Sequence, residues 1–335
     1  MANDQRNVVA LGDFDPYRSG TGQAFGNGGS LELAYIVAEL RNVRAQWRSA
    51  QKRPLEVGGR ELPSREALTG IVDGLRGALF PMRLGPPDLR QESEDYYVGH
   101  TLDAVLTALL VQVRLELGYH ARHGGPADAD MRSLEVVRDF GAALPQIRSL
   151  LDSDVLAAYH GDPAARSVDE VLLCYPGIHA MIHHRIAHQL YVLGVPLLAR
   201  LVAELAHGAT GIDIHPGAAI GPGFFIDHGT GVVIGETAEI GSNVRLYQAV
   251  TLGAKRFATD DDGHLQKGGA RHPIVEDDVV VYAGATILGR VTIGRGSTIG
   301  GNVWLTRSVP EGSHISQAQT REDARDDSLV ASPRR

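Results

Sequence analysis

The 335-residue sequence predicts an α+β protein, in which an N-terminal α-helical domain is followed by a C-terminal parallel β-helix of hexapeptide repeats. Three observations predict this class. Glycine is unevenly placed, because residues 211–301 hold 18 of the 40 glycines and the longer segment 31–210 holds 15. Segment 31–210 has apolar residues at helical spacing, whereas the glycine-rich segment repeats with a period of six.

These patterns divide the chain into four parts with one insertion. Residues 1–30 hold six glycines without periodicity, which predicts a mobile glycine-rich arm. Residues 31–210 form the expected α-helical domain and residues 211–310 the expected β-helix. Residues 254–273 carry charge and glycine but no repeat, so we expect an inserted loop. Residues 311–335 are expected to be a C-terminal tail.

The helical domain carries recognisable start and stop signals. Ser64 can cap the helix that starts after it, and Ser167 with Glu170 makes a capping-box pattern. Gly208 is the expected C-cap of the last helix. Helices are expected over 31–47, from 65 onward, and over 101–120, 129–159, 178–194 and 195–208, with a short one after 167.

The repeat rests on thirteen aliphatic residues, which we call anchors. Three hexads close one triangular coil of about 18 residues, with each anchor inside and stacked on the next coil. An α-helix would need a period of 3.6 and a strand a period of 2, and a glycine-rich β-sandwich is the less favoured alternative. The anchors are Ile214, Ile220, Ile226, Ile234, Ile240, Leu246, Leu252, Val275, Val281, Ile287, Ile293, Ile299 and Leu305.

Composition narrows the class of partner. The net charge of −8 gives no argument for nucleic acid or an anionic membrane. No apolar run reaches 18 residues and the N-terminus lacks a signal-peptide layout, so we expect a cytoplasmic protein. The single cysteine, Cys174, excludes a disulfide framework and is expected in the core.

Several strings resemble one enzyme family. DIHPGAAIGPGFFIDHGTGVVIGETA, VTLG, RHP, AGATILG and VTIGRGSTIGG, together with HGDPA before them, are similar to serine O-acetyltransferase over residues 155–310. The resemblance implies a left-handed β-helix. It also implies transfer of acetyl from acetyl-CoA to the hydroxyl of L-serine, giving O-acetylserine in cysteine biosynthesis.

The residues agree with that chemistry. A hydroxyl is a weak nucleophile at neutral pH and needs a base, for which histidine is the usual side chain. His228 lies in DHGTG at a two-residue slip of the repeat. Asp213 lies fifteen residues earlier, about one coil, where it could accept a hydrogen bond from the imidazole and fix its tautomer. The resemblance implies the same pair; the alternative is that His228 only caps a turn.

Serine carries an ammonium and a carboxylate, and both need partners. By resemblance, Asp162 and Asp227 are the carboxylates for the amino acid, although Asp162 could also simply start a helix turn. By the same resemblance, Arg271 and His272 hold the substrate carboxylate, which arginine can bind bidentately. Glu236 matches a family position near the site.

The co-substrate is expected in the groove between adjacent β-helices. Thioester transfer to a hydroxyl needs no metal or redox cofactor, so acetyl-CoA is the only cofactor-like molecule that we expect. By matching to the family, the residues lining its groove are Gly253, Ala254, Ala283 and Gly301.

Other interpretations stay open. The chain could acylate a different hydroxyl or amine, or be a non-catalytic β-helix scaffold. Four histidines on segment 178–194 could hold zinc, but the H-E-x-x-H pattern is absent. A γ-type carbonic anhydrase is also a trimeric β-helix with a zinc site, but its histidine spacing is missing. Structural or interface roles are favoured for these histidines.

The resemblance also concerns partners. Family active sites lie between subunits, so a homotrimer is the minimal unit and a dimer of trimers stays open. Cysteine resembles serine and is a candidate feedback inhibitor. Well-known members end in isoleucine, which enters the active site of O-acetylserine sulfhydrylase, whereas this sequence ends in Arg335. We therefore expect a weak complex with that enzyme, or none.

Overall fold

The computed structural model describes residues 33–51, 60–255, 265 and 268–317. The chain forms two units, residues 1–59 and residues 60–335. Helix α1 (Leu33–Ala50) belongs to the first unit and α2 to α8, with all the strands, to the second. The predicted arm, residues 1–30, lies outside the described residues.

Two helices of the second unit begin where their predicted serine caps place them. The Ser64 hydroxyl oxygen accepts a hydrogen bond from the Ala67 N–H, and the Ser167 hydroxyl oxygen accepts one from the Glu170 N–H. The elements are α2 (Arg65–Leu79), α3 (Pro81–Leu84), the 3-10 turn η2 (Gln91–Ser93), α4 (Glu94–Arg122), α5 (Ala129–Gly161), α6 (Val168–Cys174), α7 (Pro176–Val192) and α8 (Pro196–Thr210).

Two details of the helices differ from expectation. Helix α8 continues past Gly208 to Thr210, and its C-cap is Gly211, which has a φ of 70°. The left-handed position that favours glycine therefore falls at Gly211, and the predicted cap at Gly208 is wrong. Cys174 is exposed rather than in the core, because it ends the short helix α6, of which only Val171 is buried.

Helix α4 is long and apolar, although α5 is longer. By length and composition alone, Gln91–Arg122 could cross a membrane. The helix packs against α2 and α5, and Val105, Leu109 and Val113 are buried there. A core helix of a globular domain passes the same test, so this is weak evidence for a membrane span.

Fourteen short strands in the described chain form three parallel sheets. Their orders are β1-β4-β7-β10-β13, β2-β5-β8-β11 and β3-β6-β9-β12-β14. The strands are β1 (Asp213–Ile214), β2 (Ala219–Ile220), β3 (Phe225–Ile226), β4 (Val233–Ile234), β5 (Glu239–Ile240), β6 (Arg245–Leu246), β7 (Thr251–Gly253), β8 (Ile274–Val275), β9 (Val280–Val281), β10 (Thr286–Leu288), β11 (Thr292–Ile293), β12 (Thr298–Ile299), β13 (Trp304–Leu305) and β14 (His314–Ile315).

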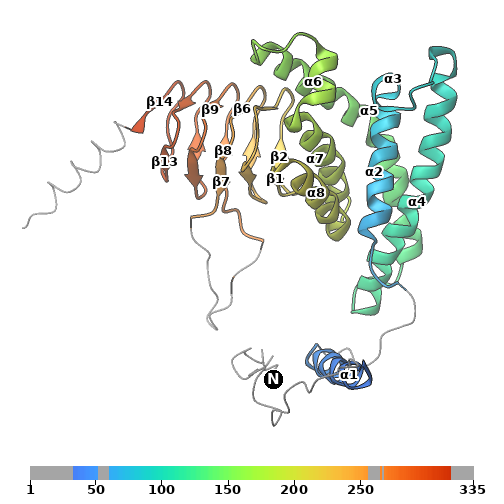
Figure 1. Ribbon diagram of the computed structural model, residues 1–335. Helices are drawn as coiled ribbons and strands as arrows, with labels where there is room; N and C mark the ends of the chain where they lie inside the picture. Colours follow the sequence, from blue (N-terminus) through green and yellow to red (C-terminus); the bar gives the residue numbers. More distant parts are fainter. Residues whose placement is uncertain (1–32, 52–59, 256–264, 266–267, 318–335) are drawn as a thin grey trace, which may run out of the picture. The chain divides into compact units, whose positions relative to one another are not determined.

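The anchors stack as the period predicts. In the first sheet, Ile214 aligns with Ile234, which in turn aligns with Leu252. All thirteen anchors are buried. The parallel β-helix after a helical region is therefore confirmed (Figure 1). Strand β14 aligns Ile315 with Ile299, so the coil continues into the segment predicted to be a tail.

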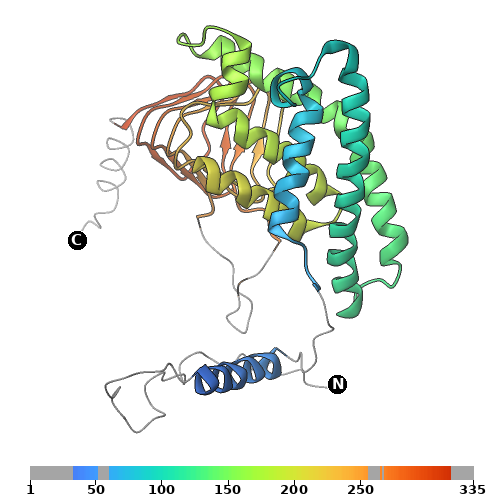
Figure 2. The same cartoon turned by 45° about the vertical axis from the view of Figure 1, so that its right-hand side comes forward.

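The last helices close one end of the β-helix. Helices α5 and α7 pack against β3, and α8 packs against β1 (Figures 1 and 2). A buried ion pair holds this junction, in which Arg185 of α7 contacts Asp154 of α5 at 3.0 Å. The same arginine donates to the Gly221 carbonyl at 2.7 Å, and Asp154 accepts from the Phe224 N–H at 2.9 Å. The helices thus fix the first coil, which carries Asp227 and His228.

Candidate active site

His228 stands at the corner of the first coil, directly after β3. Its φ of 59° is uncommon for a non-glycine residue, and its side chain is 71 % exposed. A tight turn holds it, because the Gly229 N–H donates to the Asp227 carbonyl at 2.7 Å. The turn projects the imidazole away from the coil.

Four more residues gather around this histidine. Asp227 Oδ1 lies 3.8 Å from His228 Nε2, and Asp227 Oδ2 accepts a hydrogen bond from Arg245 at 3.0 Å. Asp162, the C-cap of α5, accepts a hydrogen bond from the Tyr175 hydroxyl. We call these five residues the His228 group.

The hydrogen bond from Tyr175 stabilises the charged form of Asp162. This hydrogen bond holds the pKa of Asp162 below the ordinary value, helped by the Ala164 N–H, which donates at 2.8 Å. The same bond raises the pKa of Tyr175 to about 12. Asp162 is therefore an anion and Tyr175 a neutral donor at neutral pH, so the corner is suited to a cation.

A second group lies after β4, at the next corner. Arg271 pairs with Glu236 at 2.6 Å, and the other Glu236 oxygen accepts from the Tyr191 hydroxyl at 3.0 Å. Burial opposes the charge of Glu236, but these two hydrogen bonds hold its pKa below the ordinary value. With His272 and Thr237, these residues form the Arg271 group.

His272 is a neutral donor in this group. Burial and the Arg271 charge lower its pKa to about 4. The Thr237 N–H donates to His272 Nδ1 at 3.1 Å, so the proton of the neutral ring is on Nε2. Gly235 leaves room for the ring, since a Cβ there would lie 2.0 Å from His272 Cδ2.

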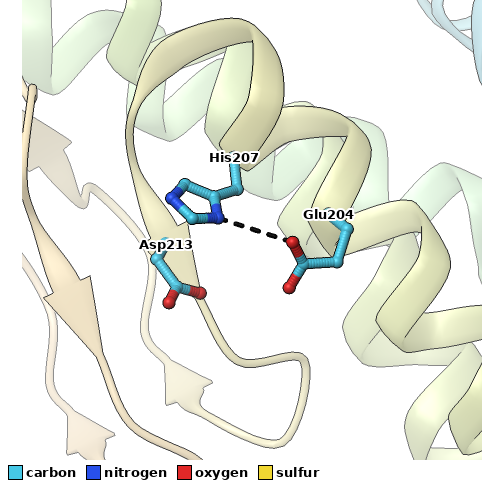
Figure 3. Close-up of side chains that lie close together, drawn as sticks. All are labelled: Glu204, His207 and Asp213. Atoms are coloured by element: carbon cyan, nitrogen blue, oxygen red, sulfur yellow. Dashed lines mark hydrogen bonds and ion pairs between the residues drawn. The ribbon is translucent and has the colours of Figure 1, made fainter. Parts of the chain in front are cut away.

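Asp213 begins β1, which lies beside β4 in the same sheet. It aligns with Val233 one coil later, twenty residues on, so the expected stacking of Asp213 beside His228 is wrong within one chain. Burial lowers the pKa of His215, and the charges of Asp213, Glu236 and Arg271 also act on this histidine. Asp213 itself lies beside Glu204 and His207 of α8 (Figure 3).

Apart from Asp213, the residues predicted to bind serine or act as base therefore fall into two groups at opposite ends of β4. The His228 group precedes this strand and the Arg271 group follows it. In the described part of a single chain, no hydrogen bond or ion pair joins the two groups.

Comparisons with known proteins identify the family of this chain. The family model "Bacterial transferase hexapeptide (six repeats)" matches residues 272–307. A serine acetyltransferase of Synechococcus elongatus is 62 % identical over 267 residues, 78 % of this chain and 84 % of that protein. The chain belongs to the serine acetyltransferase family. A Bacillus subtilis member is 48 % identical over 166 residues, 50 % of this chain and 72 % of its own.

Solved structures of the family support the fold. The crystal structure of Entamoeba histolytica serine acetyltransferase 1 in complex with L-cysteine has a TM-score of 0.64 to this chain. It is 36 % identical, and the match covers 74 % of this chain and 86 % of that one. The native form of the same enzyme gives a TM-score of 0.63 at 34 % identity, over 78 % of this chain and 90 % of its own.

The residues predicted for acetyl-CoA divide between the same two corners. Ala283 and Gly301 stack at the His228 corner, where the Asn302 N–H donates to the Ala283 carbonyl at 2.9 Å. A Cβ on Gly301 would lie 3.2 Å from that carbonyl oxygen. Gly253 ends β7 and Ala254 follows it, on the side of the Arg271 group. Each corner thus offers a backbone surface with small side chains.

Sequence reasoning missed several residues of both groups. Arg245 lies twenty residues after Phe225 and is its direct neighbour across β3 and β6. The coil length was the signal that could have found it. Tyr175 and Tyr191 come from the helical domain, and no repeat predicts their contacts. Thr237, which follows Glu236 in the GET string, accepts from the Arg271 N–H at 2.9 Å.

One cluster of possible metal ligands occurs in the described residues. Glu204, His207 and Asp213 each offer an atom within 4.8 Å of the others, and His207 lies 3.4 Å from Glu204 (Figure 3). Exposed acidic groups at such distances are common without an ion, so the cluster carries no metal assignment. On α7, His183 and His188 bond backbone carbonyls, those of His179 and Pro216.

Proposed function

We propose that this chain transfers the acetyl group of acetyl-CoA to the hydroxyl of L-serine, giving O-acetylserine and CoA for cysteine biosynthesis. The observation that carries the proposal is the exposed His228 beside two carboxylates, Asp162 and Asp227, in a chain of this family. An exposed imidazole can reach the proton of a bound hydroxyl.

In the proposed reaction, the His228 imidazole removes the proton of the serine hydroxyl. The oxygen attacks the thioester carbonyl carbon, a C–O bond forms, and collapse of the tetrahedral adduct breaks the C–S bond. The imidazolium returns its proton to the sulfur of CoA. The acetyl group thus passes from the sulfur of CoA to the oxygen of serine, and the proton passes from that oxygen to the sulfur. Water has no part in the chemical step.

The two groups divide the amino acid between them. Asp162 and Asp227 bind the ammonium, and Tyr175 stabilises the ionised form of Asp162. Arg271 and the Nε2–H of His272 bind the carboxylate, because both are donors at neutral pH. Glu236 orients the Arg271 guanidinium through their 2.6 Å contact.

A complete site then needs two copies of the chain. The His228 group of one copy faces the Arg271 group of the next, and the partner subunit's Asp213 accepts the hydrogen bond that fixes the tautomer of His228. Such a contact is heterologous and closes as a ring. We propose a homotrimer as the minimal unit, with a dimer of trimers as its extension. Acetyl-CoA lies between the copies, against Gly253, Ala254, Ala283 and Gly301.

Regulation and location follow from the same proposal. The family member from Entamoeba histolytica was crystallised in complex with L-cysteine. We propose that cysteine binds here at the serine site and inhibits by competition. We place the reaction in the cytoplasm. The prediction of a weak complex with O-acetylserine sulfhydrylase rests on Arg335, which lies outside the described residues.

Thiol release from acetyl-CoA tests the proposal. We expect release with L-serine, little with homoserine or a sugar, and a loss of at least a hundredfold in His228→Ala, since a general base contributes about 10²–10⁴-fold. His314→Ala is the matched control, because this exposed histidine lies in β14, at the far edge of the sheet that contains β3. Serine-independent release, or full activity in His228→Ala, contradicts the mechanism.

A further inference from the structure

We propose that Arg245 is a positioning residue of the ammonium subsite, which holds the Asp227 carboxylate in a single orientation. The inference rests on the proposed function, because it assigns a role within the serine site. Arg245 is outside every motif that indicated the family, and the coil alone brings it to Asp227 at 3.0 Å.

The guanidinium of Arg245 lies over two aromatic rings. Its Cζ lies 4.9 Å from the centroid of the Phe225 ring and 4.7 Å from that of Tyr247. Tyr247 is itself stacked on Tyr282, with centroids 5.0 Å apart and planes 11° apart. Stacking of this kind suits arginine and restricts its planar fork to one direction.

The register of the coil explains this arrangement. Phe225 and Arg245 are direct partners between β3 and β6, so their side chains lie one above the other on the same face. The Asp227 N–H donates to the Leu246 carbonyl at 2.9 Å, which places Asp227 beside the strand that carries Arg245. The geometry therefore comes from backbone pairing rather than from flexible side chains.

A close approach of helix α5 adds the second carboxylate. Gly161 ends this helix, and a Cβ there would lie 3.0 Å from the Phe225 ring and 3.7 Å from Arg245 Nη1. Asp162 follows directly, and the Arg245 charge adds to the effect of Tyr175 and the Ala164 N–H in lowering its pKa. The positive charge of Arg245 thus acts on both Asp162 and Asp227. Together with a bound ammonium group, it balances the two negative charges of these carboxylates.

Arg245 also selects the oxygen that is offered to the substrate. It occupies Asp227 Oδ2, while Oδ1 faces His228 at 3.8 Å. Without the guanidinium, the carboxylate is free to rotate and to bond the imidazole. That bond would draw the base toward Asp227 and away from the serine hydroxyl. Loss of Arg245 should therefore weaken both the binding of serine and the removal of its proton by His228. The binding of acetyl-CoA should not change.

Steady-state kinetics of Arg245→Gln and Arg245→Lys test the inference. We expect Arg245→Gln to lower kcat/KM for serine by about tenfold or more, as the loss of one charged hydrogen bond implies, with the KM for acetyl-CoA within about twofold of wild type. Arg245→Lys restores the charge but not the planar fork, so we expect it to recover part of the loss.

A matched control is Arg295→Gln. Arg295 pairs with Asp277 at 3.2 Å in a more exposed arginine–aspartate ion pair. The two residues follow β11 and β8, at the corner that carries neither group of the site. We expect wild-type kinetics from Arg295→Gln. The inference is overturned if Arg245→Gln keeps wild-type kcat/KM for serine, if Arg245→Lys is as impaired as Arg245→Gln, or if both KM values rise equally.

The wild-type enzyme separates the two possible failures. If it releases no CoA in the presence of serine, the proposed function fails before any variant is made. If it is active with serine and Arg245→Gln matches it, the proposed function stands and only the role of Arg245 is refuted.

Discussion

Gly235→Ala tests the placement of His272 most directly. A Cβ at this position would lie 2.0 Å from His272 Cδ2, 2.1 Å from Nε2 and 2.7 Å from Cγ. Carbon atoms in contact lie about 3.5 Å apart, so the ring must move by roughly 1.5 Å. Gly235 is not among the glycines of positive φ, so the backbone itself accepts alanine.

The expected cost follows from that displacement. A misplacement of about 1 Å in an active site costs on the order of a hundredfold in rate, or about 2.7 kcal/mol. We therefore expect kcat/KM for serine to fall by about a hundredfold in thiol-release assays, with a small change in KM for acetyl-CoA. Overpacking should also lower the free energy of unfolding by about 1–3 kcal/mol, measured by urea denaturation.

Two further variants of the chain serve as controls for this prediction. Gly99→Ala is the control for a glycine substitution as such, because a Cβ there meets nothing within 4 Å. In His272→Ala the ring is gone, so adding Gly235→Ala should cost little more. The reasoning is refuted if Gly235→Ala keeps wild-type kcat/KM, or if it costs as much without the ring as with it.

Two stability predictions follow from buried ionisable side chains. The pKa of His272 is about 4 in the folded chain, below the 6.5 of an unfolded histidine, so the unfolded chain takes up the proton first as the pH falls from 6.5 toward 4. We expect urea unfolding to show that His272→Gln loses less stability than wild type between pH 7 and 4.5, by up to about 2 kcal/mol; parallel curves would contradict this. Asp154→Ala should lower the unfolding free energy by about 3–5 kcal/mol, because Arg185 stays buried without its partner, and a loss below about 1 kcal/mol would refute that view of the junction.

The elements that the sequence predicted well are those with local causes. Ser64 and Ser167 each cap a helix through a hydroxyl three residues from the N–H that it bonds. Residues close together in the sequence therefore determine where these helices begin. The anchors repeat every six residues and need only stacking between coils. The Gly208 prediction failed because Gly211, three residues later, offers the same freedom of φ.

The candidate site was predictable in its composition and not in its arrangement. His228 and Arg271 lie in strings that resemble the family, so their roles could be proposed from letters alone. That Asp213 aligns with Val233 depends on a first coil of twenty residues, which the estimate of one coil for fifteen residues missed. Arg245 has no motif, and only the pairing of β3 with β6 brings it to Asp227.

The sequence by itself determined the β-helix, the chemical class of the side chains and the family resemblance. These depend on short-range periodicity and on residue type. The tertiary structure alone decided that the site residues separate into two groups at opposite ends of β4, and that Tyr175, Gly235 and Arg245 support them. The physical reason is that such contacts join elements remote in the chain, so their distances depend on coil lengths and helix docking.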